Sequence, residues 1–159
     1  MANDTPDQDQ KFGFNEDALR RQTTVYRDDL FKGQTVLVSG AGSGLGKAIA
    51  TLFARLGATL LVCGRNEEKI AGAADFFRSF GGQVEYQAMS IRDPDQVKAL
   101  IGYAWDTCSG LDVLVNNAGG QFPQPAIDFS PKGFNAVIDT NLNGSWYMMQ
   151  AAAQRWRDE

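Results

Sequence analysis

The sequence contains no histidine, and this absence excludes His-based catalytic triads and most catalytic zinc sites, because both use an imidazole. It also removes the commonest general base, so any acid–base chemistry must use another group. Cysteine is scarce: Cys63 and Cys108 lie far apart and form neither a CxxC pair nor a zinc-ligand spacing. We expect both to be buried, reduced thiols, and we predict no metal site.

Basic residues are also few: 15 lysines and arginines stand against 19 acidic residues, and the formal net charge is -4. Nucleic acids and anionic membrane surfaces require clustered Lys and Arg, so neither is an expected partner. No run approaches the roughly 18 apolar residues of a membrane span, and the start of the chain lacks the layout of a signal peptide. Hydrophobic residues still make up 43% of the chain, which is enough for a core. We therefore expect a soluble, cytoplasmic protein.

The 159 residues divide into two regions by composition. Residues 1–29 are polar and of mixed charge, and we interpret them as an N-terminal arm in which Glu16 to Gln22 can form one or two helical turns. Residues 30–159 alternate short apolar runs with amphipathic stretches, which is typical of an α/β domain. A doubly wound nucleotide fold needs two βαβαβ halves, and this region supplies little more than the first. We interpret it as an incomplete dinucleotide-binding domain.

Apolar runs at 35–39, 59–63, 83–87 and 112–116 predict strands. Most of these runs are continuous rather than alternating, as in parallel strands that are covered on both faces. Asp93-Pro94 and Ser130-Pro131 are typical helix starts. The predicted fold is an α/β, Rossmann-like parallel sheet of β-α-β-α-β-α-β-α order, truncated, with strand order 3-2-1-4 and the fourth strand at an edge. The predicted helix stripes are Leu45, Ile49, Leu52, Phe53 and Leu56; Ile70, Ala74 and Phe77; and Val97, Leu100, Ile101, Ala104 and Cys108.

A glycine-rich turn, GAGSGLG at 40–46, joins the first predicted strand to the helix that follows. Such a turn lets the backbone approach a pyrophosphate closely, and the helix N-terminus offers free N–H groups to the phosphates. It is not a P-loop, because Ala48 follows Lys47, and we interpret Lys47 as a solvated lysine of the first helical turn. The predicted cofactor contacts in this region are Ser39, Gly40, Ser43, Gly44, Leu45 and Gly46.

Arg65 follows the second predicted strand and lies about 20 residues after the glycine-rich turn. In dinucleotide-binding folds, the residue at this position contacts the adenosine ribose. An acidic residue at this position favours NAD, whereas an arginine can pair with the 2′-phosphate of NADP in a bidentate way. The sequence therefore favours NADP(H) over NAD(H) as the cofactor. The alternative is an ordinary surface arginine beside Glu67 and Glu68.

Three motifs together resemble the short-chain dehydrogenase/reductase family: GxxxGxG at 40–46, NNAG at 116–119 and NLNG at 141–144. The resemblance implies an NAD(P)-dependent oxidoreductase in which the NNAG residues stabilise the central sheet and line the adenosine side of the cofactor. It assigns cofactor contacts to Asn117, Ala118 and Gly119. It also implies that Asn141 is the asparagine of the catalytic tetrad, whose main chain holds a water molecule of the proton relay.

The resemblance departs from the usual pattern at Ser90, and the residue types support its assignment of Asn141. Ser90 stands where many relatives have an aspartate that binds the adenine amino group; its hydroxyl can replace that bond, and Ile91 can supply an apolar contact. Asn141 falls on the apolar face of the last predicted helix, so we expect a buried side chain with satisfied hydrogen bonds. The alternative is a polar residue satisfied by local backbone. That face comprises Phe134, Val137, Ile138, Ser145 and Met148.

The family's catalytic serine and its YxxxK tyrosine and lysine have no match in these residues, since no tyrosine is followed four positions later by a lysine. In the family the tyrosine transfers the proton, and the lysine lowers the pKa of the phenol. We therefore expect this chain by itself to be inactive. We also expect self-association, because the edge strand and the side chains of Trp146, Met148 and Met149 should be thinly covered.

A closer resemblance is carried by GGQF at 119–122, SPKGF at 130–134 and TNL at 140–142. These segments are similar to the trans-2-enoyl-CoA and 2,4-dienoyl-CoA reductases, which reduce carbon–carbon double bonds of acyl-CoA with NADPH in fatty acid metabolism. Similar segments occur in alcohol dehydrogenases of the citronellol type. The implied partners are an acyl-CoA or another small-molecule substrate and further copies of the full-length protein, as a dimer or tetramer. A non-catalytic nucleotide-binding module and a fragment that completes another chain are the alternatives.

Overall fold

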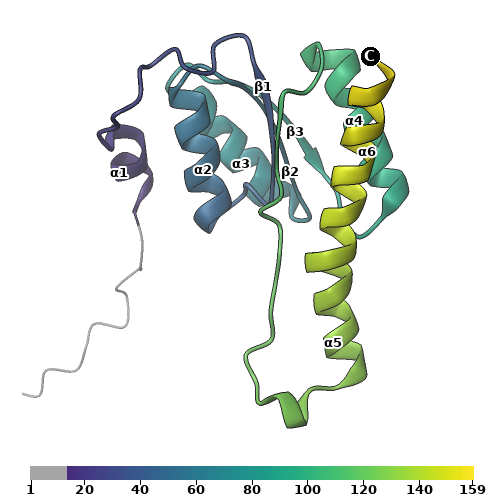
Figure 1. Cartoon of the computed structure of the whole chain (residues 1–159). Helices are drawn as coiled ribbons and strands as arrows, with labels where there is room; N and C mark the ends of the chain where they lie inside the picture. Colours follow the sequence, from purple (N-terminus) through teal and green to yellow (C-terminus); the bar gives the residue numbers. More distant parts are fainter. Residues whose placement is uncertain (1–13) are drawn as a thin grey trace, which may run out of the picture.

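The computed structural model describes residues 14–159 and shows a parallel sheet in the order β3-β2-β1-β4, with helices on both faces (Figure 1). This order confirms the predicted Rossmann-like fold, with β4 at one edge. The elements are α1 (Glu16–Arg21), β1 (Thr35–Ser39), α2 (Gly44–Arg55), β2 (Thr59–Gly64), α3 (Glu67–Arg78), β3 (Gln83–Ala88), α4 (Pro94–Cys108), β4 (Val113–Val115), the 3₁₀ turn η1 (Ala126–Asp128), α5 (Pro131–Ile138), the π-helical segment η2 (Asp139–Gly144) and α6 (Ser145–Asp158).

The two faces of the sheet carry separate apolar clusters, because successive residues of a strand point to opposite faces. Val36 and Val38 of β1 pack with α2 and α3, whereas Leu37 between them packs with α4 and α6. Leu37 lies opposite Leu61 of β2, and both are fully buried. The continuous apolar runs are therefore strands that are covered on both sides, as predicted.

Helices α3 and α4 follow their predicted apolar stripes. Ile70, Ala74 and Phe77 of α3 are fully buried against the sheet. The side chain of Asp93 accepts hydrogen bonds from two backbone N–H groups in the first turn of α4, at 3.0 and 3.2 Å. Such a cap satisfies N–H groups that have no partner within the helix, so it fixes where α4 begins.

The predicted buried face of α2 is wrong in part. Leu45 and Leu52 are 78% and 36% exposed, and the residues that face the sheet include Gly46, Ala50 and Ala54. These small residues allow the helix backbone to lie close to the strands, so there is no room for a leucine side chain at the contact. The apolar stripe alone could not show this, because it records hydrophobicity and not the distance between helix and sheet.

The closest approach of α2 to the sheet is at Gly46. A Cβ atom at this position would lie 2.3 Å from the carbonyl oxygen of Gly40 and 2.4 Å from the side-chain nitrogen of Asn117. Gly40 belongs to the turn after β1, and Asn117 belongs to the loop after β4. The small size of Gly46 therefore allows the start of α2, the turn after β1 and the loop after β4 to meet.

Helix α1 lies against α2 and confirms the helical turns expected there (Figure 1). The interpretation of Lys47 as a solvated lysine is wrong: its side chain is only 16% exposed. Its ammonium group forms an ion pair with Glu16 and lies 4.7 Å from the centre of the Phe76 ring. Arg55 donates a hydrogen bond to the carbonyl of Leu19 at 3.1 Å. Both basic residues of α2 thus hold α1 in place.

The last predicted helix is not regular, because η2 interrupts it between α5 and α6. Trp146 and Met149 are 54% and 47% exposed, as expected, but Met148 is fully buried. The expectation for Met148 is wrong because α6 packs on α4 along the side that carries Met148 and Ala152. Within residues 14–159, no helix is both long enough and apolar enough to cross a membrane.

The contact at Gly46 can be tested by Gly46→Ala, because the added methyl group would overlap a backbone carbonyl. We expect the free energy of unfolding, measured by urea denaturation, to fall by about 1–3 kcal/mol. The matched control is Gly72→Ala in α3, where a Cβ atom would meet nothing within 4 Å. There we expect a gain of about 0.5–1 kcal/mol, because alanine loses less backbone entropy than glycine. Equal stability of Gly46→Ala and the wild type would contradict the close contact.

Candidate cofactor-binding site

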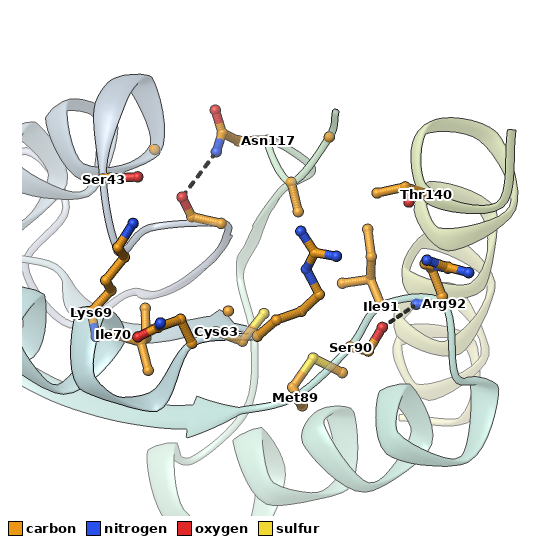
Figure 2. Close-up of a pocket in the computed structure, with 18 of the residues that line it drawn as sticks. Ser43, Cys63, Lys69, Ile70, Met89, Ser90, Ile91, Arg92, Asn117 and Thr140 are labelled. Atoms are coloured by element: carbon orange, nitrogen blue, oxygen red, sulfur yellow. Dashed lines mark hydrogen bonds between the residues drawn. The ribbon is translucent and has the colours of Figure 1, made fainter. Parts of the chain in front are cut away.

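A cavity of about 380 Å³ lies at the carboxyl ends of the strands (Figure 2). In an open parallel sheet, ligands bind in the crevice outside these strand ends. The structure brings most of the predicted contacts together there, and it places Ser39, Gly44 and Asn141 outside the lining. The predicted residues that line the cavity are Gly40, Ser43, Leu45, Gly46, Arg65, Ser90, Ile91, Asn117, Ala118 and Gly119.

The glycine turn after β1 forms one wall of the cavity. Gly40 has a φ of +72°, in the left-handed region that favours glycine, and its N–H donates to the carbonyl of Cys63 at 2.8 Å. At the start of α2, the side chain of Ser43 makes no cap hydrogen bond, whereas Asn66 and Asp93 cap α3 and α4. The first N–H groups of α2 are therefore left for a ligand, and a helix N-terminus of this kind binds phosphate.

Ser39 and Asn117 join β1 to the loop after β4. The buried hydroxyl of Ser39 donates to the carbonyl of Val115 at 3.3 Å and accepts from the N–H groups of Asn117 and Ala118, both at 3.1 Å. The side-chain amide of Asn117 donates to the carbonyls of Ser39 and Gly40, at 3.0 and 3.3 Å. Ser39 thus lies beneath the cavity, where its hydrogen bonds hold the wall in position.

The charged side chains that line the cavity are all basic. They are Arg65, Lys69 and Arg92, and no aspartate or glutamate is among the lining residues. Figure 2 shows Lys69 at one end, extending toward the glycine turn and Ser43, and Arg92 near Thr140 at the other end. Cations gathered in a concave site create a local positive potential that attracts anions, although the chain as a whole is acidic.

Lys69, Arg92 and Thr140 also line the cavity, although the sequence did not predict them. A signal was available for Lys69, because it lies in the first turn of α3, directly after the segment that contains Arg65. Thr140 belongs to η2, far along the chain, and only the packing of that segment brings it to the cavity.

The segment after β3 forms the end of the cavity away from the glycine turn. The hydroxyl of Ser90 accepts a hydrogen bond from the N–H of Arg92 at 3.3 Å, and the N–H of Ser90 donates to the side-chain carbonyl of Gln96 at 2.9 Å. Ile91 is only 6% exposed and packs against Gly144 of η2, where a Cβ atom would lie 2.8 Å from the isoleucine side chain. The absence of a side chain at Gly144 therefore fixes how closely η2 approaches this end.

Both cysteines are free thiols. Cys63 is fully buried at the floor of the cavity, and its burial raises the pKa of the thiol to about 12. The group is therefore neutral at physiological pH and is not a nucleophile. Cys108 is half-buried rather than buried as expected, and burial raises its pKa too. In the part of the chain that the structure describes, no group of three His, Cys, Asp or Glu side chains could hold a metal ion.

Asn141 is exposed, so the expected burial of its side chain is wrong. Both of its polar atoms are instead bound to the backbone of Gly120: the carbonyl oxygen accepts from the N–H and the amide donates to the carbonyl, each at 2.9 Å. Phe134 is also exposed, at 56%, although Met148 is buried. The π-helical segment η2 contains more residues per turn than an α-helix, so residues before and after it do not share the predicted face.

The model of the short chain dehydrogenase family matches residues 34–159. Among curated proteins, the chain is 38% identical over 126 residues to a Bacillus subtilis (strain 168) protein named as a probable 2,4-dienoyl-CoA reductase, covering 79% of this chain and 50% of the relative. It is 32% identical over 127 residues to the peroxisomal 2,4-dienoyl-CoA reductase of Arabidopsis thaliana, covering 80% of this chain and 43% of the relative.

Solved structures of the same family superpose on this fold. The citronellol catabolism dehydrogenase of Pseudomonas aeruginosa PAO1 is 36% identical with a TM-score of 0.79, over 83% of this chain and 54% of that one. The gluconate 5-dehydrogenase of Burkholderia cenocepacia J2315, solved with NADP and tartrate, is 33% identical with a TM-score of 0.74, over 80% and 51%. The chain spans about half the length of the curated relatives it matches. From the fold, the cavity and these matches, the chain belongs to the short-chain dehydrogenase family of oxidoreductases.

Proposed function

We propose that this chain is the cofactor-binding part of an NADP(H)-dependent reductase that acts on a carbon–carbon double bond of an enoyl-CoA or dienoyl-CoA. The observation that carries the choice of NADP(H) is the charge of the cavity: Arg65, Lys69 and Arg92 line it, and no lining residue is acidic. A carboxylate at the ribose position would repel a 2′-phosphate, whereas a guanidinium group can bind it with two hydrogen bonds. The substrate class is supported by the names of the 2,4-dienoyl-CoA reductases among its relatives.

The residues of the cavity fit a dinucleotide. The glycine turn and the uncapped start of α2 suit a pyrophosphate, Arg65 suits a 2′-phosphate, and Ile91 offers an apolar surface to the base. Reduced nicotinamide, when bound, supplies a hydride to the substrate. The residues of this chain would bind and orient the cofactor rather than transfer the proton, because no tyrosine is followed by the YxxxK lysine. We infer that residues 1–159 alone bind the nucleotide without turnover.

Asn141 would act in this reaction through its main chain. Its side chain accepts one hydrogen bond from Gly120 and donates one to it, and this pair ties η2 to the loop that continues from Gly119 at the cavity wall. A π-helical turn departs from the regular i→i−4 hydrogen bonding of an α-helix, and such turns are frequent at functional sites. The side chain is therefore a positioning group that holds the main chain of η2 next to the cofactor site.

A second candidate is an alcohol dehydrogenase, because the citronellol catabolism dehydrogenase is 36% identical over 83% of this chain. The cofactor site is shared by both candidates, so the two differ only in the residues that would contact the substrate. An assay of the full-length protein distinguishes them: it should use a 2,4-dienoyl-CoA with NADPH, and citronellol with NADP+.

Arg65→Asp tests the choice of cofactor. We expect the substitution to weaken NADPH binding by about tenfold to 100-fold, because it removes a charge-assisted phosphate pair worth about 1.5–3 kcal/mol. NADH binding should change little or improve. Isothermal titration calorimetry measures both affinities, and Arg27→Asp, at an exposed arginine that pairs with Asp29 outside the cavity, is the matched control. Unchanged NADPH affinity in Arg65→Asp would contradict the proposal.

Asn141→Ala tests the positioning role of the side chain. We expect faster hydrogen exchange at the Gly120 amide, because the substitution removes the acceptor of that N–H. The free energy of unfolding should fall by about 0.5–1.5 kcal/mol for each lost hydrogen bond. Asn143→Ala is the control, because the Asn143 side chain binds Asp139 within η2 and not Gly120. If the Gly120 amide exchanges equally fast in both variants, Asn141 does not hold this loop.

A further inference from the structure

The base of a bound nucleotide would lie at the end of the cavity formed after β3. Phosphates are expected at the start of α2, and the ribose at Arg65 after β2. The lining segment that continues the cavity beyond Arg65 follows β3, the next strand outward in the sheet, and includes Ser90, Ile91 and Arg92. This placement rests on the proposed nucleotide-binding function.

The side chains at this end can donate hydrogen bonds but include no carboxylate. The Ser90 oxygen accepts from the N–H of Arg92, and among residues 14–159 its hydroxyl proton has no acceptor, so it is available to a ligand. The nearby Asp93 is directed elsewhere: its carboxylate caps α4 and accepts from the side-chain amide of Gln96 at 2.8 Å. Arg92 also lies at this end, and Figure 2 shows its exposed side chain beside Thr140 at the edge of the cavity.

Adenine and hypoxanthine differ in the direction of the hydrogen bond that they form at position 6. Adenine carries an amino group there, which donates, beside the acceptor N1; hypoxanthine carries a carbonyl, which accepts, beside N1–H. A carboxylate only accepts and would therefore select the amino purine, whereas a hydroxyl both donates and accepts. We propose that Ser90, whose hydroxyl can both donate and accept, makes this site tolerant of the base, so that it binds 6-oxo and 6-amino purine dinucleotides with similar affinity.

The apolar contacts at this end do not depend on the group at position 6. Ile91 and Met89 are 6% and 8% exposed and line the cavity. Ile91 is held in place by Gly144 of η2, so its position is set by packing and not by the ligand. Both purines present the same ring face to these side chains, and the apolar contribution to binding is therefore equal for the two. Only the polar groups of the site can therefore discriminate between the 6-amino and the 6-oxo purine.

The test is a calorimetric titration of residues 1–159 with NADPH and with its hypoxanthine analogue, deamino-NADPH. We expect the two dissociation constants of the wild type to agree within about threefold, which is less than one hydrogen bond contributes. Ser90→Asp should bind NADPH at least tenfold more tightly than deamino-NADPH, because the new carboxylate accepts from the amino group and repels the carbonyl. Ser90→Asn, which keeps a donor and an acceptor, should retain the tolerance.

Ser130→Asp is the matched control, because Ser130 caps α5 outside the cavity and aspartate caps a helix equally well. It should leave both dissociation constants unchanged. A wild-type preference for NADPH of more than tenfold, or a Ser90→Asp protein with an unchanged ratio, would overturn the inference while leaving the proposed cofactor site intact. Failure of the folded wild type to bind either nucleotide would overturn the proposed function itself, and the inference with it.

Discussion

The contact between Gly46 and the turn after β1 is the constraint on which the candidate cofactor site depends. The backbone of α2 reaches the carbonyl of Gly40 and the amide of Asn117 at this position, and the space that a Cβ atom would need is already occupied. The start of α2 is thereby fixed against the sheet, with its first N–H groups free of a side-chain cap. Any larger residue would move the helix away from the turn and from the loop after β4 together. One missing side chain thus sets the relative positions of three walls of the cavity.

Burial on both faces of the sheet extends this constraint to the rest of the site. The strands pair in parallel and in register, so their carboxyl ends reach the same edge, and the segments that follow them meet there. Val36 and Val38 pack against one layer of helices and Leu37 packs against the other, which leaves the sheet little freedom to tilt. At the far end, Gly144 allows η2 to approach Ile91. Packing that is remote from any ligand therefore defines the length and the ends of the cavity.

The charge of the site differs in sign from the charge of the protein. The chain carries a formal net charge of -4, yet the charged residues of the cavity are Arg65, Lys69 and Arg92. A net charge describes solubility and long-range association, whereas the binding of a small anion depends on the groups within a Debye length of it. Lys47 follows the glycine turn directly, but it forms an ion pair with Glu16 and does not line the cavity. The distribution of the cations, rather than their number, therefore makes the cavity suited to an anionic ligand.

Local sequence was sufficient to predict the strands, the cap at Asp93 and the glycine turn, because these depend on residues that are neighbours along the chain. The order of the sheet was predicted from the alternation of strands and helices together with the regular topology of doubly wound folds. The same reasoning misjudged the buried face of α2, the environment of Lys47 and the burial of Asn141. The first two depend on segments far away in sequence, through the distance of α2 from the sheet and the docking of α1. The third depends on the π-helical geometry of η2, which departs from the regular helical period on which the prediction rested. A periodic pattern specifies which side chains share a face, but the face that becomes buried, and the charges that meet across a cavity, are set by how the elements pack.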